Sequence, residues 1–203
     1  MMPQQITFND VKGLEQFVAK EFDKPHLQKE MKVGNVFVKC FNKNPTYKLS
    51  INPSLFLNQL LQTVSSHGNN SKAFELLANC WKAIENLLTI NSPKIAQQFA
   101  SIPSNIALLL EHLLKAVPDV QKIILRILAQ VAQYDTVIDQ FNLNKKFILN
   151  LLRTLFVLDN EELQIMTLTL IRDMIVSNSQ FVLTLKQSGG ILYIIYKIGR
   201  AHV

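Results

Sequence analysis

The sequence predicts an all-α fold, an armadillo/HEAT-like helical-repeat solenoid. Three segments share one pattern: INSPKIAQQFASIPSNIALLLEHLL, AQYDTVIDQFNLNKKFILNLLRTL and VSNSQFVLTLKQSGGILYIIYKI. In each, two apolar residues four positions apart precede a gap and then a longer apolar run. The first residues of these anchor pairs, Ile95, Val137 and Phe181, are spaced by 42 and then 44 residues. Such a period is typical of armadillo and HEAT repeats.

Packing explains why a repeat of this length forms a solenoid. One unit of two or three helices cannot bury its own apolar stripe, so neighbouring units stack and share a continuous core. The composition agrees, because 48% hydrophobic and 18% charged residues with only 6 glycines favour a folded helical chain. An irregular bundle of similarly spaced helices is the alternative.

The chain divides into three predicted parts. Residues 1–70 form N-terminal helices that lead into the repeats, residues 71–197 form the armadillo-like repeats, and residues 198–203 are a non-native tail. No apolar run reaches the ~18 residues of a membrane span. The start, MMPQQITFNDVKG, lacks the apolar core of a signal peptide.

Three helices are expected in the first part. Asn9 or Asp10 caps a helix through about Phe22, and a second runs over about 27–41. Asn44 and Pro45 end the second helix, because the residue before a proline avoids the helical region. A third begins at Pro53, and residues 67–71 form the next loop.

Helix start signals recur through the repeats. Predicted caps or first residues are Ser92 with Pro93, Ser104, Pro118, Asp135 and Asn160, and a helix begins at about Lys145. Gly189 and Gly190 separate the final two helices. A helix over 72–90 is expected to direct its apolar side chains inward: Phe74, Leu77, Ala78, Trp81, Ile84 and Leu88.

The last six residues, IGRAHV, interrupt the repeat pattern. One reading frame of a common sequencing adapter, ATC GGA AGA GCA CAC GTC, encodes the same hexapeptide. We therefore expect native sequence to stop near Lys197, in a fragment of a longer protein. A genuine short polar tail is the alternative.

The charge pattern favours neither nucleic acid nor a membrane as partner. The net charge is +6, but the lysines between residues 20 and 48 are interleaved with Glu21, Asp23 and Glu30. A nucleic-acid surface needs cations gathered on one face. Cys40 and Cys80 lie in apolar helical patterns, which predicts buried free thiols.

No catalytic or cofactor motif is found in the sequence, so a non-enzyme without cofactors is expected. Gly189-Gly190 lacks the phosphate-loop and dinucleotide patterns, and no zinc or calcium spacing occurs. His112 beside Glu111 is the nearest acid–base candidate, but its apolar helix favours a partly exposed helical residue. Trp81 is expected in the core.

One stretch resembles a known family. VGNVFVKCFNKNPTYKL followed by PSLFLNQLL is similar to the C-terminal region of the large endosomal DnaJ-domain proteins of receptor-mediated endocytosis (DnaJ homologue subfamily C, member 13 type). Asn44, Pro45 and Tyr47 approximate the family's Asn-Pro-aromatic turn, with Thr46 intervening. The downstream SPKIAQQFASIPSNIALLLEHL and DTVIDQF follow in the family's order, and the resemblance covers roughly residues 33–197.

The resemblance implies a cytoplasmic protein, peripheral on early endosomes, that acts in membrane trafficking. Family members recruit a heat-shock cognate chaperone through a J domain and act in retromer- and WASH-linked sorting. The J domain's His-Pro-Asp signature does not occur in this sequence, so that activity is not carried over. What the resemblance leaves is a protein-binding scaffold with an armadillo-like region.

The expected function is therefore a non-catalytic interaction scaffold within an endosomal DnaJ-family co-chaperone. An unrelated armadillo-like adaptor is the alternative. Binding is expected in a groove made by the third helices of successive repeats, which begin near Ser104 and Lys145. The expected exposed contact residues on these helices are Asn105, Glu111, Lys146, Asn150 and Arg153.

Overall fold

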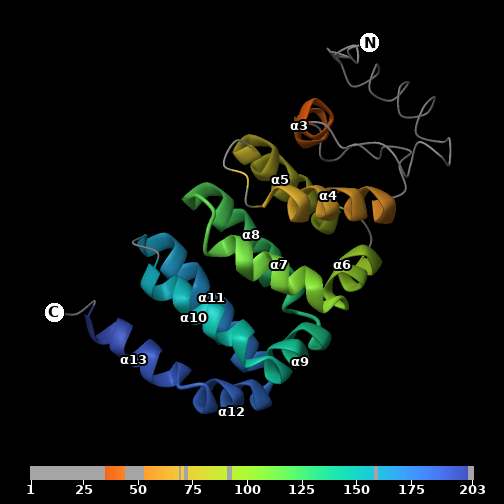
Figure 1. Cartoon of the computed structure of the whole chain (residues 1–203). Helices are drawn as coiled ribbons and strands as arrows, with labels where there is room; N and C mark the ends of the chain where they lie inside the picture. Colours follow the sequence, from red (N-terminus) through yellow and green to blue (C-terminus); the bar gives the residue numbers. More distant parts are fainter. Residues whose placement is uncertain are drawn as a thin grey trace, which may run out of the picture. The chain divides into compact units, whose positions relative to one another are not determined.

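A computed structural model describes residues 35–43, 53–68, 70, 73–90, 93–157 and 160–200 (Figure 1). Its regular elements in these ranges are helices, which confirms the all-α prediction. The helix expected at about 10–22, the first part of the helix over 27–41, the loop residues around Pro45 and the side chain of Cys40 lie outside the described residues.

The chain forms two compact units, Met1–Ile95 and Ala96–Val203. The first unit contains α3 (Asn35–Lys43), α4 (Pro53–His67) and α5 (Phe74–Ile90). Helix α5 packs on both α3 and α4 within the first unit. The start of the repeats at residue 71 stays a prediction. The helix α6 (Pro93–Ala100) spans the division.

The core of the first unit is built on α5. Trp81 and Cys80 are fully buried there, as predicted, and the Phe41 and Phe56 rings of α3 and α4 meet edge to face with centroids 5.1 Å apart. The prediction that Phe74 points inward is wrong, since 44% of it is exposed. The physical reason is that α5 begins at Phe74, two residues later than expected, so the ring stands at the end of the helix.

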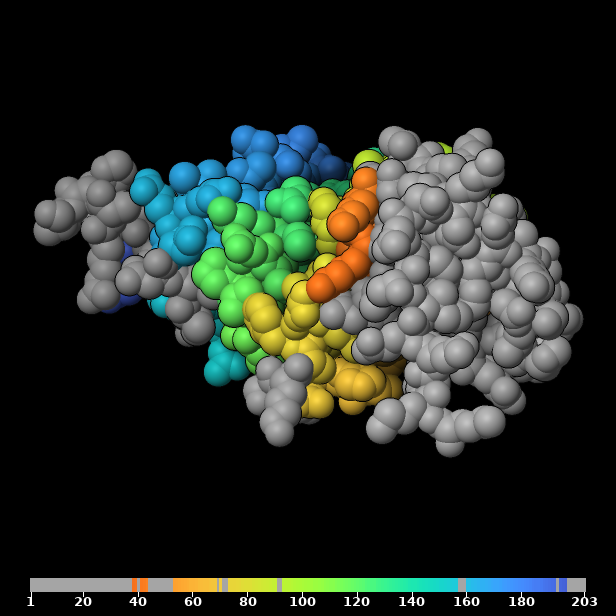
Figure 2. Space-filling model, turned by 90° about the horizontal axis from the view of Figure 1, so that it is seen from above, coloured from red at the N-terminus to blue at the C-terminus, as the bar shows by residue number. Residues whose placement is uncertain are grey.

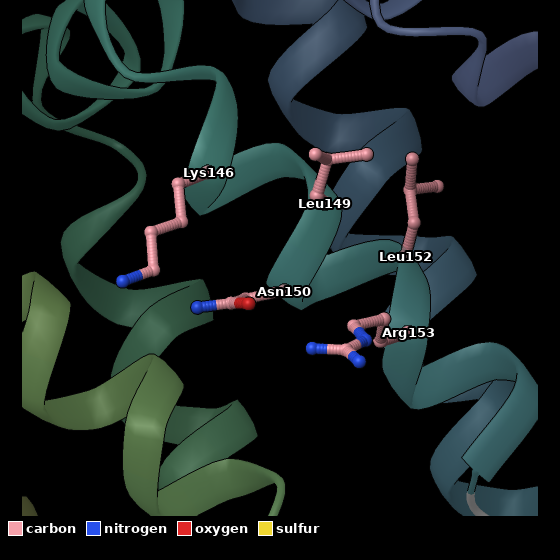
Figure 3. A pocket seen from close by; sticks show the side chains of 5 residues that line it. All are labelled: Lys146, Leu149, Asn150, Leu152 and Arg153. Carbon is pink, nitrogen blue, oxygen red and sulfur yellow. The ribbon is translucent and has the colours of Figure 1, made fainter.

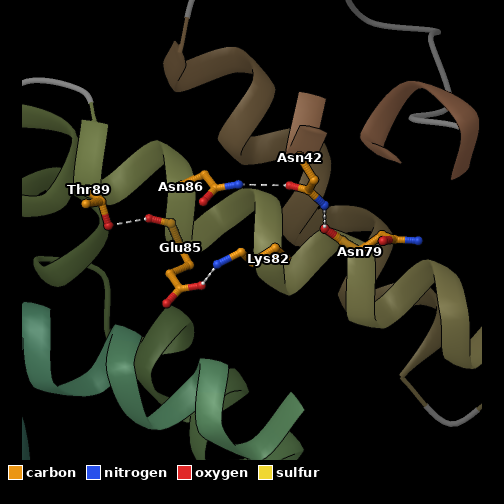
Figure 4. Close-up of polar contacts among 6 residues, drawn as sticks. All are labelled: Asn42, Asn79, Lys82, Glu85, Asn86 and Thr89. Carbon is orange, nitrogen blue, oxygen red and sulfur yellow. Dashed lines mark hydrogen bonds and ion pairs between the residues drawn. The ribbon is translucent and has the colours of Figure 1, made fainter. Parts of the chain in front are cut away.

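A partly buried polar contact joins α3 to α5 (Figure 4). The Asn42 side chain donates to the Asn79 carbonyl at 2.9 Å and accepts from Asn86 Nδ2 at 3.1 Å. Asn86 is only 8% exposed, so this bond satisfies an amide that has little access to water. Glu85, one residue before it, pairs with the Lys82 ammonium at 2.7 Å.

The second unit repeats one helical arrangement. Its helices are α7 (Pro103–Leu113), α8 (Pro118–Val131), α9 (Asp135–Leu143), α10 (Lys145–Val157), α11 (Glu161–Ser177), α12 (Ser179–Gln187) and α13 (Gly190–Arg200). Helices in equivalent positions pack on one another: α7 on α10 and α10 on α13, α8 on α11, and α9 on α12. From above, the green segment of α8 lies beside the blue segment of α11 (Figure 2).

The three anchor pairs form the core, as their periodicity predicts. All six residues are at most 7% exposed: Ile95, Phe99, Val137, Phe141, Phe181 and Leu185. Within the second unit, the Phe141 ring meets those of Phe147 and Phe181 edge to face, with centroids 5.7 and 6.3 Å away. The anchor Phe141 therefore contacts a residue of its own repeat and the first anchor of the next repeat.

Prolines and asparagines open most of the helices. Pro53, Pro93 and Pro118 are the first residues of their helices, as predicted, because a first-turn residue needs no amide donor. The Asn160 cap is confirmed, since its side chain accepts from Leu163 N at 3.1 Å. Asn178 caps α12 in the same way by accepting from Gln180 N, a cap that was not predicted from the sequence.

One predicted helix start and one predicted cap are wrong. Helix α7 begins at Pro103, one residue before the predicted start at Ser104, because proline's fixed φ suits the first helical position. Tyr134, not Asp135, is the N-cap residue of α9, and no side chain caps that end. Asp135 lies inside the first turn, where the helix dipole still favours its carboxylate.

The final two helices meet at Gly189 and Gly190. Gly189 has φ of 75°, the left-handed conformation that ends α12, and Gly190 begins α13. Helix α13 continues through Arg200, so residues 198–200 of the expected tail prolong the helix. The adapter origin of that tail stays a prediction, and residues 201–203 lie outside the described part.

Candidate protein-binding site

A cavity of about 260 Å³ lies against α10 (Figure 3). Three of the five residues predicted from the sequence line it, namely Lys146, Asn150 and Arg153. Leu149 and Leu152 complete the described lining. Part of the surface predicted on this helix therefore lines a cavity, and its role in binding stays a prediction.

Helical spacing gathers these side chains on one side of α10. Lys146, Asn150 and Arg153 are four and then three residues apart, which places them on one face. In Figure 3 their polar ends extend to the same side of the helix, whereas Leu149 and Leu152 point to another. The backbone amide of Lys146 donates to Asn144 Oδ1 at 3.1 Å, which helps to fix the start of the helix.

The charge at this cavity is positive. In the part of the chain that the structure describes, neither the Lys146 ammonium nor the Arg153 guanidinium forms an ion pair. Both residues are exposed. They are therefore available to an anionic ligand.

Glu111 lies on α7, the helix that packs against α10. The pKa of its carboxyl is lowered, first by the hydrogen bond from Lys115 and by the charge of Lys115, and further by the charges of His112 and Lys146. The Lys115 ammonium lies 2.7 Å from the carboxylate. Glu111 is thus exposed as predicted, and it is close enough to Lys146 for the two charges to interact.

Asn105, the fifth predicted residue, is not at the surface. It is 8% exposed, and its side-chain amide donates to the Phe99 carbonyl at 3.1 Å. The prediction of an exposed contact residue is wrong because this amide satisfies the carbonyl near the end of α6. The repeat carries a signal for this, since the position 42 residues later is the buried Phe147.

His112 also differs from expectation. It was predicted to be partly exposed, but only 7% of it is accessible. Burial lowers its pKa, and the neighbouring Glu111 carboxylate opposes that shift. The physical reason for the burial is that His112 lies within the core stripe of α7, between Leu109 and Leu113, which are fully buried.

The two leucines were missed by the search for polar contact residues. Leu149 is 41% exposed, whereas Leu152 is buried. Leu149 follows Lys146 by three residues and precedes Arg153 by four, which places it at the edge of their face, and this spacing is the signal that could have identified it. Together the lining offers two cations, one amide and an apolar wall.

Comparison with known proteins adds no assignment. No protein-family model matches the sequence, and no curated protein and no solved structure is significantly similar to it. Among the described helices, none is both long and apolar enough to traverse a bilayer. In the same residues, no three His, Cys, Asp or Glu side chains gather as metal ligands would.

Proposed function

We propose that this chain is a non-catalytic protein-interaction scaffold of the armadillo/HEAT type, and that the cavity on α10 binds an acidic peptide segment. The observation that carries the proposal is the lining of that cavity. Lys146 and Arg153 place two cations beside the Asn150 amide, and Leu149 adds exposed apolar surface.

Repeated packing supports the solenoid part of the proposal. Equivalent helices of successive repeats contact each other within the second unit, and the anchor pairs spaced by 42 and 44 residues are buried. In a solenoid, each repeat contacts only the neighbouring repeats, and each repeat contributes one helix to a shared surface. Helices α7 and α10, which carry Glu111 and the cavity, occupy such equivalent positions.

The ligand chemistry follows from the charges. A guanidinium binds a carboxylate through two parallel hydrogen bonds, and an ammonium adds a point charge. An acidic side chain beside a leucine or similar residue would satisfy both the cations and the apolar wall. The net charge of +6 also favours encounter with an acidic partner.

A labelled peptide of alternating glutamate and leucine is the probe for this site, with binding to the full chain followed by fluorescence anisotropy. The double variant Lys146→Glu/Arg153→Glu should bind at least about tenfold more weakly. Lys186→Glu is the control, because it reverses the charge of an exposed cation on α12 as each substitution in the double variant does. It should leave the affinity nearly unchanged. Equal binding by the double variant and the native chain would overturn the acidic-peptide site.

We also propose the cellular setting that the family resemblance implies. In that setting the scaffold belongs to an endosomal DnaJ-family co-chaperone, whose other parts recruit a heat-shock cognate chaperone and sorting machinery. Extending the transcript in both directions tests this directly. A His-Pro-Asp J domain upstream in frame supports the trafficking role, whereas its absence from the full reading frame leaves an unrelated armadillo-like adaptor.

A further inference from the structure

Helix α13 carries an exposed apolar stripe. Leu192, Ile195 and Tyr196 are 73, 61 and 51% exposed. Their spacing of three and one residues places them on one helical face. Tyr196 stacks on Phe156 of α10 with ring centroids 6.3 Å apart, so one edge of this face continues onto the neighbouring helix.

The equivalent stripe is buried in the two preceding repeats. Counting back by the anchor spacings of 44 and 42 residues leads from Leu192, Ile195 and Tyr196 to equivalent positions in α10 and α7. All six of those residues are at most 2% exposed: Ile148, Leu151, Leu152, Ile106, Leu109 and Leu110. The sequence of α13 thus keeps a core stripe that the described structure leaves open.

The contacts of α7 and α10 indicate what covers such a stripe. Helix α8 packs on α7 and also on α11, and α11 packs on α10 and also on α8. A helix in the next such position would therefore contact α13 and α11. Helix α11 exposes Ile165 and Val176, 55 and 79%, which are three helical turns apart on one side. Both helices thus expose apolar residues, and an occupant in that position would contact both helices.

We propose that the exposed faces of α13 and α11 bind an amphipathic helix, which packs there as α8 packs on α7 and α11 packs on α10. The docked helix continues two interfaces already present in this chain. Its own apolar residues follow the pattern of α8, whose buried apolar residues are Val120, Ile124, Leu125, Ile127, Leu128 and Val131. This surface is apolar and lies on other residues than the acidic-peptide site, so either can fail without the other.

A synthetic, fluorescently labelled peptide of residues 118–133 is the probe, titrated with the full chain. We expect saturable binding, and none by a peptide of the same composition in scrambled order. Leu192→Glu and Ile195→Glu should each weaken binding at least about tenfold, because each places a charge in the apolar contact. Leu143→Glu is the matched control, since Leu143 is 87% exposed on α9.

Both α13 substitutions fall on exposed positions, so circular dichroism should show an unchanged helical content. Absence of saturable binding overturns the proposal, as does equal weakening by Leu143→Glu. Sedimentation of the chain alone tests a second copy as occupant. A dimer that Leu192→Glu dissociates, and that the peptide does not, would replace the docked helix with self-association.

Discussion

The Thr184 hydroxyl donates a hydrogen bond of 2.8 Å to Asn142 Oδ1, and this bond has a counterpart one repeat earlier. There Gln140 Nε2 donates to the Ala100 carbonyl at 2.7 Å. Each donor directly precedes the second anchor of its repeat, and each acceptor directly follows the second anchor of the repeat before. Neighbouring repeats are therefore joined by a polar bond as well as by an apolar core.

Replacing Thr184 by valine should lower the free energy of unfolding by about 1 kcal/mol, because Asn142 Oδ1 loses its donor while the side-chain shape is kept. Urea denaturation of the single variants, of Asn142→Ala and of the double variant measures the coupling between the two side chains. Thr136→Val, at an exposed position on α9, is the control and should be nearly neutral. Strictly additive effects of Thr184→Val and Asn142→Ala would contradict the bond.

Stability should depend on pH through His112. Burial lowers its pKa below the ordinary value of 6.5, so the unfolded chain binds a proton at a pH where the folded chain does not. Stability from this group is therefore present above about pH 6.5 and is lost as the pH falls through the lowered pKa. His112→Gln should flatten the pH dependence of the unfolding free energy in that range.

The neighbouring carboxyl affects that measurement in two ways. The pKa of Glu111 is lowered from its ordinary value of 4.5, so Glu111→Gln should remove the pH dependence that this carboxyl contributes around and below that value. It also removes the carboxylate that opposes the lowering of the His112 pKa, so the loss of stability that depends on His112 should extend to lower pH. A histidine variant whose profile matches the native one between about pH 5 and 7 would show that His112 is not the group that titrates.

Cys80 should resist thiol reagents while the chain is folded. Burial raises its pKa from 9.0 to about 12, which lowers the reactive thiolate about 1,000-fold at neutral pH. In a Cys40→Ser background, reaction with a disulfide reagent at pH 8 should be slow in buffer and fast in concentrated urea. Equal rates in the two conditions would contradict a buried thiol.

The two adjacent glycines should respond differently to substitution. Gly189 has positive φ and open space around it, so Gly189→Ala should cost about 1 kcal/mol of stability and Gly189→Asn less. At Gly190, a Cβ would stand 2.7 Å from Leu185 Cδ1 and 2.9 Å from Leu152 Cδ1. Gly190→Ala should cost about 1–3 kcal/mol by overpacking, and Gly190→Asn should not recover it. Thermal or urea denaturation of the four variants separates strain from crowding.

Features encoded by local spacing were predictable from the sequence. The anchor pairs, the proline-led starts of α4, α6 and α8, and the Asn160 cap depend on a few neighbouring residues. The boundary between compact units was not predictable in this way, because it depends on which helices pack on α5.

The orientation of single polar residues was the other limit. Asn105 and His112 look like surface residues in sequence, but a carbonyl at the end of α6 and the core stripe of α7 hold them inside. The position of Lys146, Asn150 and Arg153 on one polar face was predictable, because an amphipathic helix exposes its polar face regardless of the neighbours. The adjoining leucines matter only once the cavity is formed.

Unequal burial along the repeat has a dynamic consequence. Helices α7 and α10 bury the stripe that α13 exposes, so opening α13 sacrifices less apolar contact than opening either of them. Amide hydrogen exchange should accordingly be fastest in α13 and slower in α10, which packs on both α7 and α13. The free energy of local opening then differs from helix to helix. If a helix binds to α13, the α13 amides alone should become more protected from exchange.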